Sequence, residues 1–481
     1  MEKRNLTLLT DLYELTMMQG YFDKGQNETV IFDMFYRSNP CDGGYAICAG
    51  LEQVIEYIKN LNFTYEDIDY LRSLNIFSEG FLNYLSGFHF TGDIYGIPEG
   101  SVIFPKEPLV KVIAPIMEAQ LVETAILNII NHQSLIATKT SRVVFAANGD
   151  GIMEFGLRRA QGPDAGIYGA RAAMIGGCVG TSNVLAGQAF DVPVSGTHAH
   201  SWIMSFKDEY TAFKHYSDIY PNNCILLVDT YDTLKSGVPN AIRVFQEMKN
   251  AGITLSRYGI RLDSGDLAYL SKEARKLLDL AGFEDAIISA SNDLDEYLLH
   301  DLKMQDAKIT SWGVGTNLIT SKDCPSFGGV YKLAAIQNEA GDFVPKIKIS
   351  ENSTKITNPG NKTIYRIYEK ESGKIKADLI TFADETFDES EDLLLFDPVD
   401  TWKKTTLPGN SYYMRELLLP VFIKGECVYH SPSVMEIAKY CEEEKNTLWD
   451  ETKRLFYPHQ IYVDLSSKLW KVKQDLLNKL S

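Results

Sequence analysis

Short apolar or β-branched runs that each end in a polar cluster recur along the middle of the chain. The runs are GIMEFGLRR, VPVSGTHAHS, CILLVDTYDT, RYGIRLDSGD, AIISASND and TSWGVGTN, which start at positions 151, 192, 224, 257, 286 and 310. Buried parallel strands separated by helices give this alternation. Because the polar residues gather where each strand would end, the pattern favours an irregular β/α barrel with its site on that face. A doubly wound open sheet gives the same pattern and stays open as an alternative.

The first residues of the chain predict a helix. Apolar residues recur at helical spacing over residues 5–22, and Thr10 or Asp11 can cap the start. Glu14 stands where the carboxylate of a capping box is expected. We therefore expect this segment to begin a separate α+β region.

The remaining flanks mix strands and helices. Residues 91–115 predict strand pieces broken by proline turns, and residues 117–145 predict one long helix. Residues 344–350 and 363–370 alternate like partly exposed strands, and the tail from 434 onward has a helical, charged pattern.

These changes of pattern predict three regions. Residues 1–145 form an N-terminal α+β domain, and residues 146–340 form the β/α barrel catalytic domain. Residues 341–481 pack back on the N-terminal domain, so that both ends of the chain build the second domain. A chain of 481 residues is long enough for such an arrangement.

Composition narrows the class of protein. The charged fraction of 23% is ordinary for a globular chain, and no apolar run is long enough to predict a membrane span. The formal net charge of −17 argues against a nucleic-acid-binding surface. Seven scattered cysteines without a C-x-x-C pair, together with a start that does not read as a signal peptide, predict a cytoplasmic protein with reduced thiols.

Three of the strand ends carry residues suited to an anionic substrate. In RLDSGD, Arg261 and Asp263 are two residues apart and project to the same side of a strand. Arg261 can bind a carboxylate or phosphate through two donors, whereas an ion pair that only closes a turn is the structural alternative. FGLRR places Phe155 beside arginines, which suits a flat anionic ring or an ordinary core contact. The glycines of WGVGTN allow close backbone approach to a phosphate.

Two histidines in SGTHAHSW leave three interpretations open. His198 and His200 share a face if the strand persists, and could then bind zinc as in metal-dependent barrel hydrolases. None of the other histidines falls in a later strand-end cluster, which disfavours this metal site. A nucleophilic or acid/base imidazole and a structural histidine are the other two interpretations.

Taken together, these segments resemble the nicotinate phosphoribosyltransferase family. The motifs, from residue 5 to about 335, are LLTDLYELTMMQGY, FYRSNP, GGYAICAGL, FGLRRAQGPD, GTSNVLAG, SGTHAHSW, VDTYDT, RLDSGD, WGVGTN and FGGVYKL. The resemblance implies that nicotinate and phosphoribosyl pyrophosphate give nicotinate mononucleotide and pyrophosphate. It also implies coupled ATP hydrolysis (hence a formal ligase), Mg²⁺, a role in NAD biosynthesis through the Preiss–Handler salvage route, and a homodimer with active sites at the interface.

The resemblance also implies how nicotinate is held. Phe155 and Tyr13 of the partner subunit would sandwich the pyridine ring. Thr197, Arg261 and Arg158 would surround its carboxylate. Asp263 would engage the ribose or its Mg²⁺, although no metal ligand is implied directly.

The resemblance also implies which residues bind the phosphate groups of the substrate. Gly313, Gly315 and Thr316 would hold the 5′-phosphate, while Arg37 and Lys332 would bind the pyrophosphate. These roles come from the positions of the family's motifs.

His200 resembles the histidine that ATP phosphorylates, because it directly precedes Ser201 as in the family. His198 is left without a role. Ser182 stands where the related nicotinamide enzymes carry an aspartate, and a serine there removes a repulsion against the carboxylate of nicotinate. A phosphoribosyltransferase acting on nicotinamide or quinolinate, a metal-dependent hydrolase and a binding protein are the alternatives.

Overall fold

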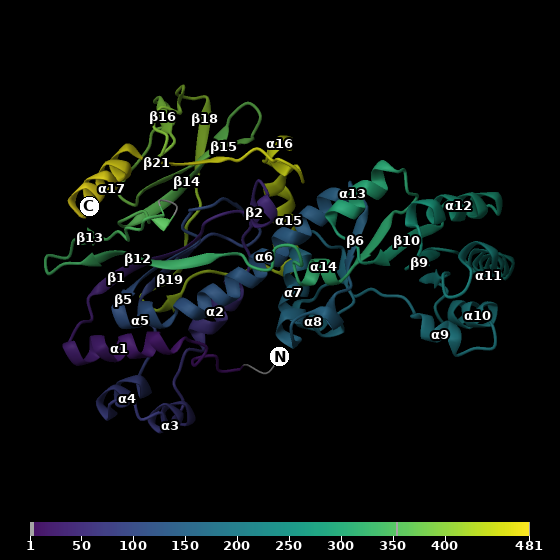
Figure 1. Ribbon diagram of the computed structural model, residues 1–481, viewed down its shortest axis with the longest axis horizontal. Coiled ribbons are helices and arrows are strands. Elements are labelled where there is room, and N and C mark those ends of the chain that lie inside the picture. Colours follow the sequence, from purple (N-terminus) through teal and green to yellow (C-terminus); the bar gives the residue numbers. More distant parts are fainter. Residues whose placement is uncertain (1–3, 353–354, 481) are drawn as a thin grey trace. The chain divides into compact units, whose positions relative to one another are not determined.

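The computed structural model describes residues 4–352 and 355–480, and the chain divides into two compact units. The first unit combines the residues up to Thr138 with those from Ser326 onward, and the second unit runs from Lys139 to Pro325. Figure 1 shows the helices and strands of both. No helix among the described residues is long and apolar enough to cross a membrane.

A six-stranded parallel sheet is the framework of the second unit, with strand order β7-β6-β11-β10-β9-β8. Its strands are β6 (Gly151–Glu154), β7 (Gly180–Thr181), β8 (Cys224–Leu227), β9 (Tyr258–Leu262), β10 (Ile287–Asn292) and β11 (Ser311–Val314). Helices α7 (Pro163–Gly176), α8 (Val184–Phe190), α9 (His200–Met204), α10 (Glu209–Ile219), α11 (Val238–Asn250), α12 (Leu267–Leu280), α13 (Glu296–Met304) and α14 (Thr316–Ile319) alternate with them. Ile260 and Val314 are fully buried, as expected for strands of a parallel sheet covered by helices.

The sheet is a partial barrel, which confirms the predicted β/α fold. Its edge strands are β7 and β8. The predicted strand over 192–201 is wrong: Val194 makes only an isolated parallel bridge to Thr181, and His200 already begins α9. The reason is local, because Pro193 has no N–H to donate to a ladder. Its carbonyl accepts from the Thr181 N–H, and the Ser195 N–H donates to the Thr181 carbonyl.

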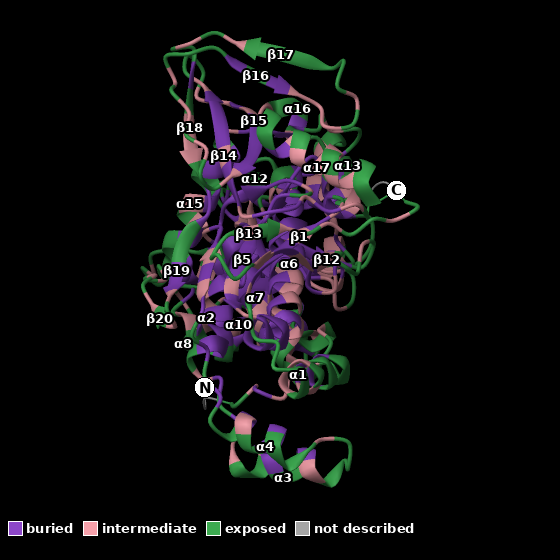
Figure 2. Cartoon of the chain, turned by 90° about the vertical axis from the view of Figure 1, so that its left-hand side faces the viewer, coloured by how far each residue is buried: buried purple, intermediate pink, exposed green. Residues whose placement is uncertain are grey.

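Two sheets form the first unit. The seven-stranded sheet has the order β13-β12-β1-β5-β3-β19-β20 and the four-stranded sheet the order β18-β14-β15-β21. The larger sheet contains β1 (Thr29–Tyr36), β3 (Asp93–Gly96), β5 (Val110–Pro115), β12 (Gly329–Gln337), β13 (Phe343–Pro345), β19 (Leu419–Ile423) and β20 (Glu426–Cys427). The smaller contains β14 (Lys362–Glu369), β15 (Ile375–Phe382), β18 (Tyr412–Glu416) and β21 (Tyr462–Leu465). Figure 2 shows β1, β5 and β14 as largely buried strands.

Helices and two small pairings complete the first unit. The pairs are β2 (Ala46–Ile47) with β4 (Val102–Ile103), and β16 (Leu393–Phe396) with β17 (Lys404–Leu407). The helices are α1 (Leu12–Lys24), α2 (Leu51–Lys59), α3 (Tyr65–Ser73), α4 (Glu79–Ser86), α5 (Ile116–Leu121), α6 (Glu123–Ala147, which crosses into the second unit), α15 (Val434–Asn446), α16 (Asp450–Lys453) and α17 (Ser467–Leu480). Segments from both ends of the chain thus share one α+β unit, as predicted.

Three local expectations need correction. The predicted helix over 117–145 is broken at Val122 into α5 and α6. The C-terminal tail is not entirely helical, since β21 pairs in parallel with β15. Of the segment 344–350, only the first two residues belong to a strand, β13.

The predicted capping box of α1 is absent. Asp11 is the N-cap residue, but its side chain accepts from Thr124 Oγ1 at 3.1 Å and caps no backbone N–H. Glu14 is fully buried and accepts from Thr10 Oγ1 at 2.5 Å and from Thr124 Oγ1 at 2.7 Å. Contacts with α6 therefore take both carboxylates away from the helix start.

Candidate active site

The carboxyl ends of the parallel strands in the second unit bring the predicted catalytic residues together. Arg261 lies opposite Leu227 on β8 and Ser289 on β10, and Ser291 lies opposite Gly313 on β11. Because these strands share one direction, the residues that follow each of them meet on one side of the sheet. The site can be built outward from Arg261.

Three hydroxyl or carboxylate groups hold the guanidinium of Arg261. Its Nε donates to Ser291 Oγ at 2.8 Å, one terminal nitrogen to Thr197 Oγ1 at 2.8 Å, and the other to Asp263 Oδ1 at 2.9 Å. The contact with Asp263 confirms that the two residues project to the same side. Ser291 also donates to the same Asp263 oxygen. A side chain tied at all three nitrogens is fixed in position before any substrate arrives.

An aromatic ring lies beside this guanidinium. The Arg261 guanidinium carbon is 5.6 Å from the centroid of the Phe155 ring, in the range of a cation–π contact. Gly313 makes room for the ring, since a Cβ there would lie 2.5 Å from Phe155 Cδ2. The close approach expected at this glycine is therefore made by an aromatic side chain of the protein. Gly315 is less crowded, with a Cβ that would lie 3.3 Å from the Phe155 carbonyl oxygen.

His200 and His198 have different surroundings. His200 exposes 39% of its side chain, shares a hydrogen bond of 3.0 Å between Nδ1 and Thr230 Oγ1, and places Nε2 3.8 Å from Asp263 Oδ2. His198 is buried, and its Nε2 accepts from the Leu227 N–H at 3.3 Å. Burial lowers the pKa of His198 to about 4, and the charges of Arg261 and His200 act in the same direction. His198 is thus a neutral histidine of the barrel wall.

The geometry disfavours a zinc site at these histidines. The strand on which they would share a face does not form. Within residues 4–352 and 355–480, neither histidine has two further metal-ligating groups close enough to complete a cluster. A metal-dependent hydrolase would need such a cluster.

Asp229 is a site residue that sequence reasoning missed. It follows β8, and its Oδ2 accepts from the Asp263 N–H at 2.8 Å and from Ser264 Oγ at 2.7 Å. These bonds orient the backbone that carries Asp263. The signal was present in the sequence, because Asp229 opens the polar cluster of the run CILLVDTYDT. Ser291 was missed in the same way at the end of β10.

Other predicted residues surround this centre within the second unit. Ser182 follows β7, where its N–H donates to the Glu154 carbonyl at 2.9 Å, next to the strand that leads to Phe155. Arg158 is exposed in a turn of 3-10 helix. Thr316 is half-buried at the start of α14.

Three predicted residues belong to the first unit. Tyr13 on α1 is 47% exposed, and burial of its hydroxyl together with the charge of Glu123 raises its pKa. The Nζ of Lys332, on β12, lies 3.8 Å from Glu123 Oε1. Burial lowers the pKa of Lys332, and the neighbouring charges of Lys348 and Arg37 add to this.

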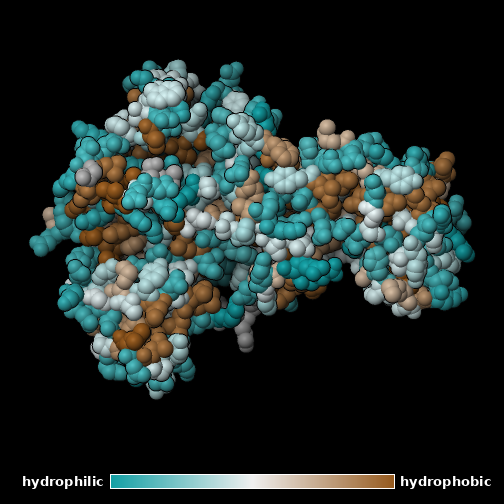
Figure 3. Space-filling model, viewed as in Figure 1, coloured by the Kyte–Doolittle hydropathy of each residue, from teal (hydrophilic) through white to brown (hydrophobic). Residues whose placement is uncertain are grey.

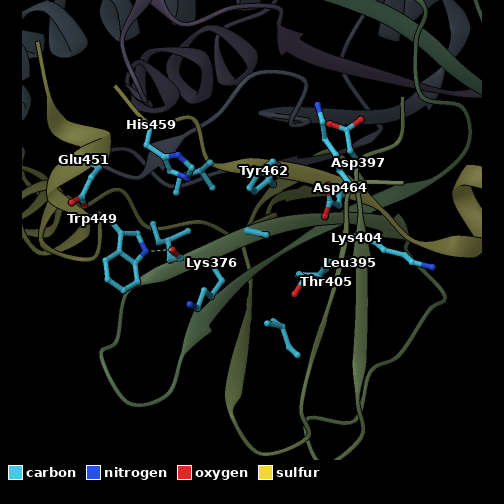
Figure 4. Close-up of a pocket in the computed structure, with 15 residues that line it drawn as sticks. Lys376, Leu395, Asp397, Lys404, Thr405, Trp449, Glu451, His459, Tyr462 and Asp464 are labelled. Carbon is cyan, nitrogen blue, oxygen red and sulfur yellow. Dashed lines mark hydrogen bonds between the residues drawn. The ribbon is translucent and has the colours of Figure 1, made fainter. Parts of the chain in front are cut away.

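A large cavity lies elsewhere in the first unit. It has a volume of about 640 Å³, with Trp449 and His459 toward one end and Asp397 and Asp464 toward the other (Figure 4). No predicted site residue lines it.

Comparisons with known proteins agree with the geometry. Sequence profiles match over residues 8–131 (nicotinate phosphoribosyltransferase N-terminal domain), 151–375 (nicotinate phosphoribosyltransferase family) and 361–473 (nicotinate phosphoribosyltransferase C-terminal domain). The chain is 46% identical over 477 residues to the nicotinate phosphoribosyltransferase of Bacillus subtilis, covering 99% of this chain and 96% of the relative. It is 30% identical to the human enzyme over 532 residues, covering 98% and 96%.

Solved structures agree as well. The crystal structure of human nicotinic acid phosphoribosyltransferase superposes with a TM-score of 0.83 at 29% identity, covering 98% of this chain and 99% of that one. A nicotinate-nucleotide pyrophosphorylase from Pyrococcus furiosus shares the fold, with a TM-score of 0.69 at 23% identity and coverage of 92% and 96%. By the three profile matches and the full-length similarity, this chain belongs to the nicotinate phosphoribosyltransferase family.

Proposed function

We propose that this protein transfers the phosphoribosyl group of phosphoribosyl pyrophosphate to nicotinate, forming nicotinate mononucleotide and pyrophosphate. The observation that carries the proposal is the fixed guanidinium of Arg261 beside the Phe155 ring. A flat ring with a carboxylate fits this pair, because the ring stacks on Phe155 while the carboxylate meets the cationic Arg261 and the Thr197 hydroxyl.

The reaction breaks the bond between the sugar C1 and pyrophosphate and forms a bond from C1 to the pyridine nitrogen. Positive charge develops on the sugar and negative charge on the leaving group. The protein supplies placement of the pyridine by Phe155 and Arg261, and cationic groups for pyrophosphate at Arg37 and Lys332. No covalent link between sugar and protein is required.

The 5′-phosphate would lie at the end of β11. Thr316 offers a hydroxyl and an N–H for it at the start of α14, and the turn that contains Gly313 and Gly315 precedes these groups, although the Phe155 ring occupies the space next to Gly313. Arg158, exposed near Phe155, would add a second positive charge toward the nicotinate carboxylate.

The residues present also fit Mg²⁺. Asp263 uses Oδ1 for Arg261 and Ser291, while Oδ2 has no hydrogen-bond donor among the described residues and its side chain is 32% exposed. An oxygen of this kind suits Mg²⁺ bound through water or through the ribose hydroxyls. Bound with the substrate, the ion would neutralise charge on the departing pyrophosphate.

We further propose that ATP hydrolysis is coupled to the transfer through phosphorylation of His200. The choice between the two histidines rests on access, because the His200 ring is exposed and the His198 ring is buried in the barrel wall. A phosphate on His200 would add negative charge next to Asp263 and could order the groups that meet pyrophosphate. ATP is then a co-substrate, as in a ligase.

A homodimer with shared active sites is part of the proposal. Leu12, Tyr13 and Met17 expose 54%, 47% and 39% of their surface on α1, and apolar side chains gather around α1 and α4 in Figure 3. Exposed apolar side chains on one helix are typical of a contact with another chain. Tyr13 would then stack on the nicotinate of the partner subunit. We also propose a cytoplasmic role in NAD biosynthesis by the Preiss–Handler salvage route.

Product formation from nicotinate, nicotinamide and quinolinate, each assayed with and without ATP, tests the proposal. We expect nicotinate to be used by far the best, with ATP increasing product formation. Dominant turnover of nicotinamide or quinolinate would overturn it. Ser182→Asp sharpens the test, because a carboxylate there should lower kcat/KM for nicotinate by about tenfold or more through repulsion of its carboxylate.

A further inference from the structure

A small cavity in the first unit is lined by an unusual number of ammonium groups. It lies among β1, the segments that precede β5 and β14, and the C-terminal helix α17, and its volume is about 60 Å³. Lys106, Lys362 and Lys473 line it, together with the carboxylate of Asp33. None of these residues belongs to the proposed transferase site.

The charges in this cavity do not balance. Lys362 is matched, because its Nζ lies 2.7 Å from Asp33 Oδ2 and donates to the Gly360 carbonyl at 2.8 Å. Among the described residues, Lys473 Nζ donates to a single acceptor, the neutral Asn358 Oδ1, at 2.8 Å. Lys106 is exposed. Hydrogen bonds from the Asp400 and Val399 N–H groups outweigh burial and lower the pKa of Asp397, with smaller contributions from Lys403 and Lys106, but Asp397 does not line the cavity. Three cations therefore face one carboxylate.

Two features show that this arrangement costs free energy in the absence of an anion. Burial, together with the charges of Lys106 and Lys362, lowers the pKa of Lys473 to about 8. This desolvation and like-charge repulsion are offset when an anion binds between the lysines.

Size and hydrogen bonding limit which anion fits. A bound water needs about 10–15 Å³ of space measured in this way, so a volume of about 60 Å³ accommodates a small oxyanion. Asp33 Oδ1 is buried and has no hydrogen-bond donor among the residues that the structure describes. It can accept from the P–OH group of hydrogen phosphate, a donor that sulfate lacks.

We propose that this cavity is a binding site for inorganic phosphate, held by Lys106 and Lys473 and recognised through Asp33. The site ties α17 to the segments before β5 and β14, so phosphate stabilises the first unit. The proposal concerns a second anion site, separate from the phosphate groups of the transferase substrates.

Calorimetric titration of the full chain with phosphate and with sulfate, at constant ionic strength, tests the site. We compare the wild type with Lys473→Met and with Lys471→Met, which removes the same charge from an exposed position on the same helix. Loss of a charge-assisted hydrogen bond should weaken phosphate binding about tenfold or more in Lys473→Met only. Equal phosphate affinity in all three proteins, or sulfate binding as tight as phosphate, would overturn the proposal.

A second readout does not depend on how the variant folds. Acylation of the Lys473 amine in the wild type, mapped by mass spectrometry, should slow about tenfold in phosphate relative to chloride.

Thermal unfolding of the two variants provides a third readout. Without phosphate, Lys473→Met should melt no lower than Lys471→Met, because it removes a desolvated charge. A purely structural lysine would give the opposite melting order and no protection from acylation, and either of these results counts against the site.

Discussion

A methyl group added at Gly313 would collide with the ring that the proposed function needs most. Its carbon would lie 2.5 Å from Phe155 Cδ2 and 2.6 Å from Cε2. Carbon atoms in favourable contact are about 3.5–4.0 Å apart, so the ring of a Gly313→Ala protein must retreat by roughly 1 Å. A displacement of that size at a substrate-positioning group can cost about 10²-fold in rate. We therefore expect kcat/KM for nicotinate to fall by about two orders of magnitude.

Gly151→Ala provides the matched control. Gly151 lies on β6, the neighbour of β11, where it pairs with Ser311. Its added carbon would meet only Val179 Cγ2, at an ordinary 3.4 Å. The same atoms are thus added to the same sheet without a collision. Steady-state kinetics and thermal unfolding of both variants separate a displaced ring from a general weakening of the sheet, for which overpacking costs about 1–3 kcal/mol.

A double variant shows whether the Phe155 ring transmits the effect of Gly313→Ala on catalysis. If the Phe155 ring transmits the effect, adding Gly313→Ala to Phe155→Leu should cost little more than Phe155→Leu alone, because the two changes act through one contact. Losses that simply multiply would show that Gly313 acts by another route. Unchanged kinetics in Gly313→Ala would refute the placement of the ring.

Three further predictions concern charge. Arg261→Lys should lower kcat/KM for nicotinate about 10²-fold in steady-state assays, because a single ammonium cannot replace the fixed guanidinium. His200→Ala should abolish acid-labile labelling from radioactive ATP while slow, ATP-independent product formation persists, and His198→Gln should keep the label; the reverse pattern would show that the wrong histidine was chosen. Burial raises the pKa of Glu14 to about 7, so the folded state favours the protonated acid and loses stability as pH rises from about 4.5 to 7. Melting temperatures should therefore show Glu14→Gln gaining a few degrees on the wild type across that range, and a constant difference would contradict this.

The sequence could predict which residues stand at strand ends, because apolar runs bounded by polar clusters mark the ends of buried strands. The pairing of Arg261 with Asp263 followed from spacing alone. The partners on other strands could not be predicted in this way. Ser291 and Asp229 reach the site because β10 and β8 flank β9, and strand order depends on tertiary packing rather than on local pattern.

The failed strand at 192–201 has a physical explanation. Its composition resembles the other runs, but Pro193 cannot donate to a ladder, and only Val194 forms a bridge. The lost cap at Asp11 has a different origin, because a contact with a distant residue, Thr124 on α6, outweighs local preference.

The segment from Pro193 to His198 lies between the two edge strands of the sheet, β7 and β8. Two backbone hydrogen bonds to Thr181 hold it on one side. On the other side, the Leu227 N–H donates to the His198 ring and Arg261 donates to Thr197 Oγ1. Because these bonds replace a continuous ladder, we expect the segment to open locally at a lower free energy than the strands of the sheet. Thr197 and His200 lie on that segment or directly after it. Two side chains proposed to meet nicotinate and ATP thus lie on or beside a segment that we expect to open locally, whereas Arg261 lies on β9 within the sheet.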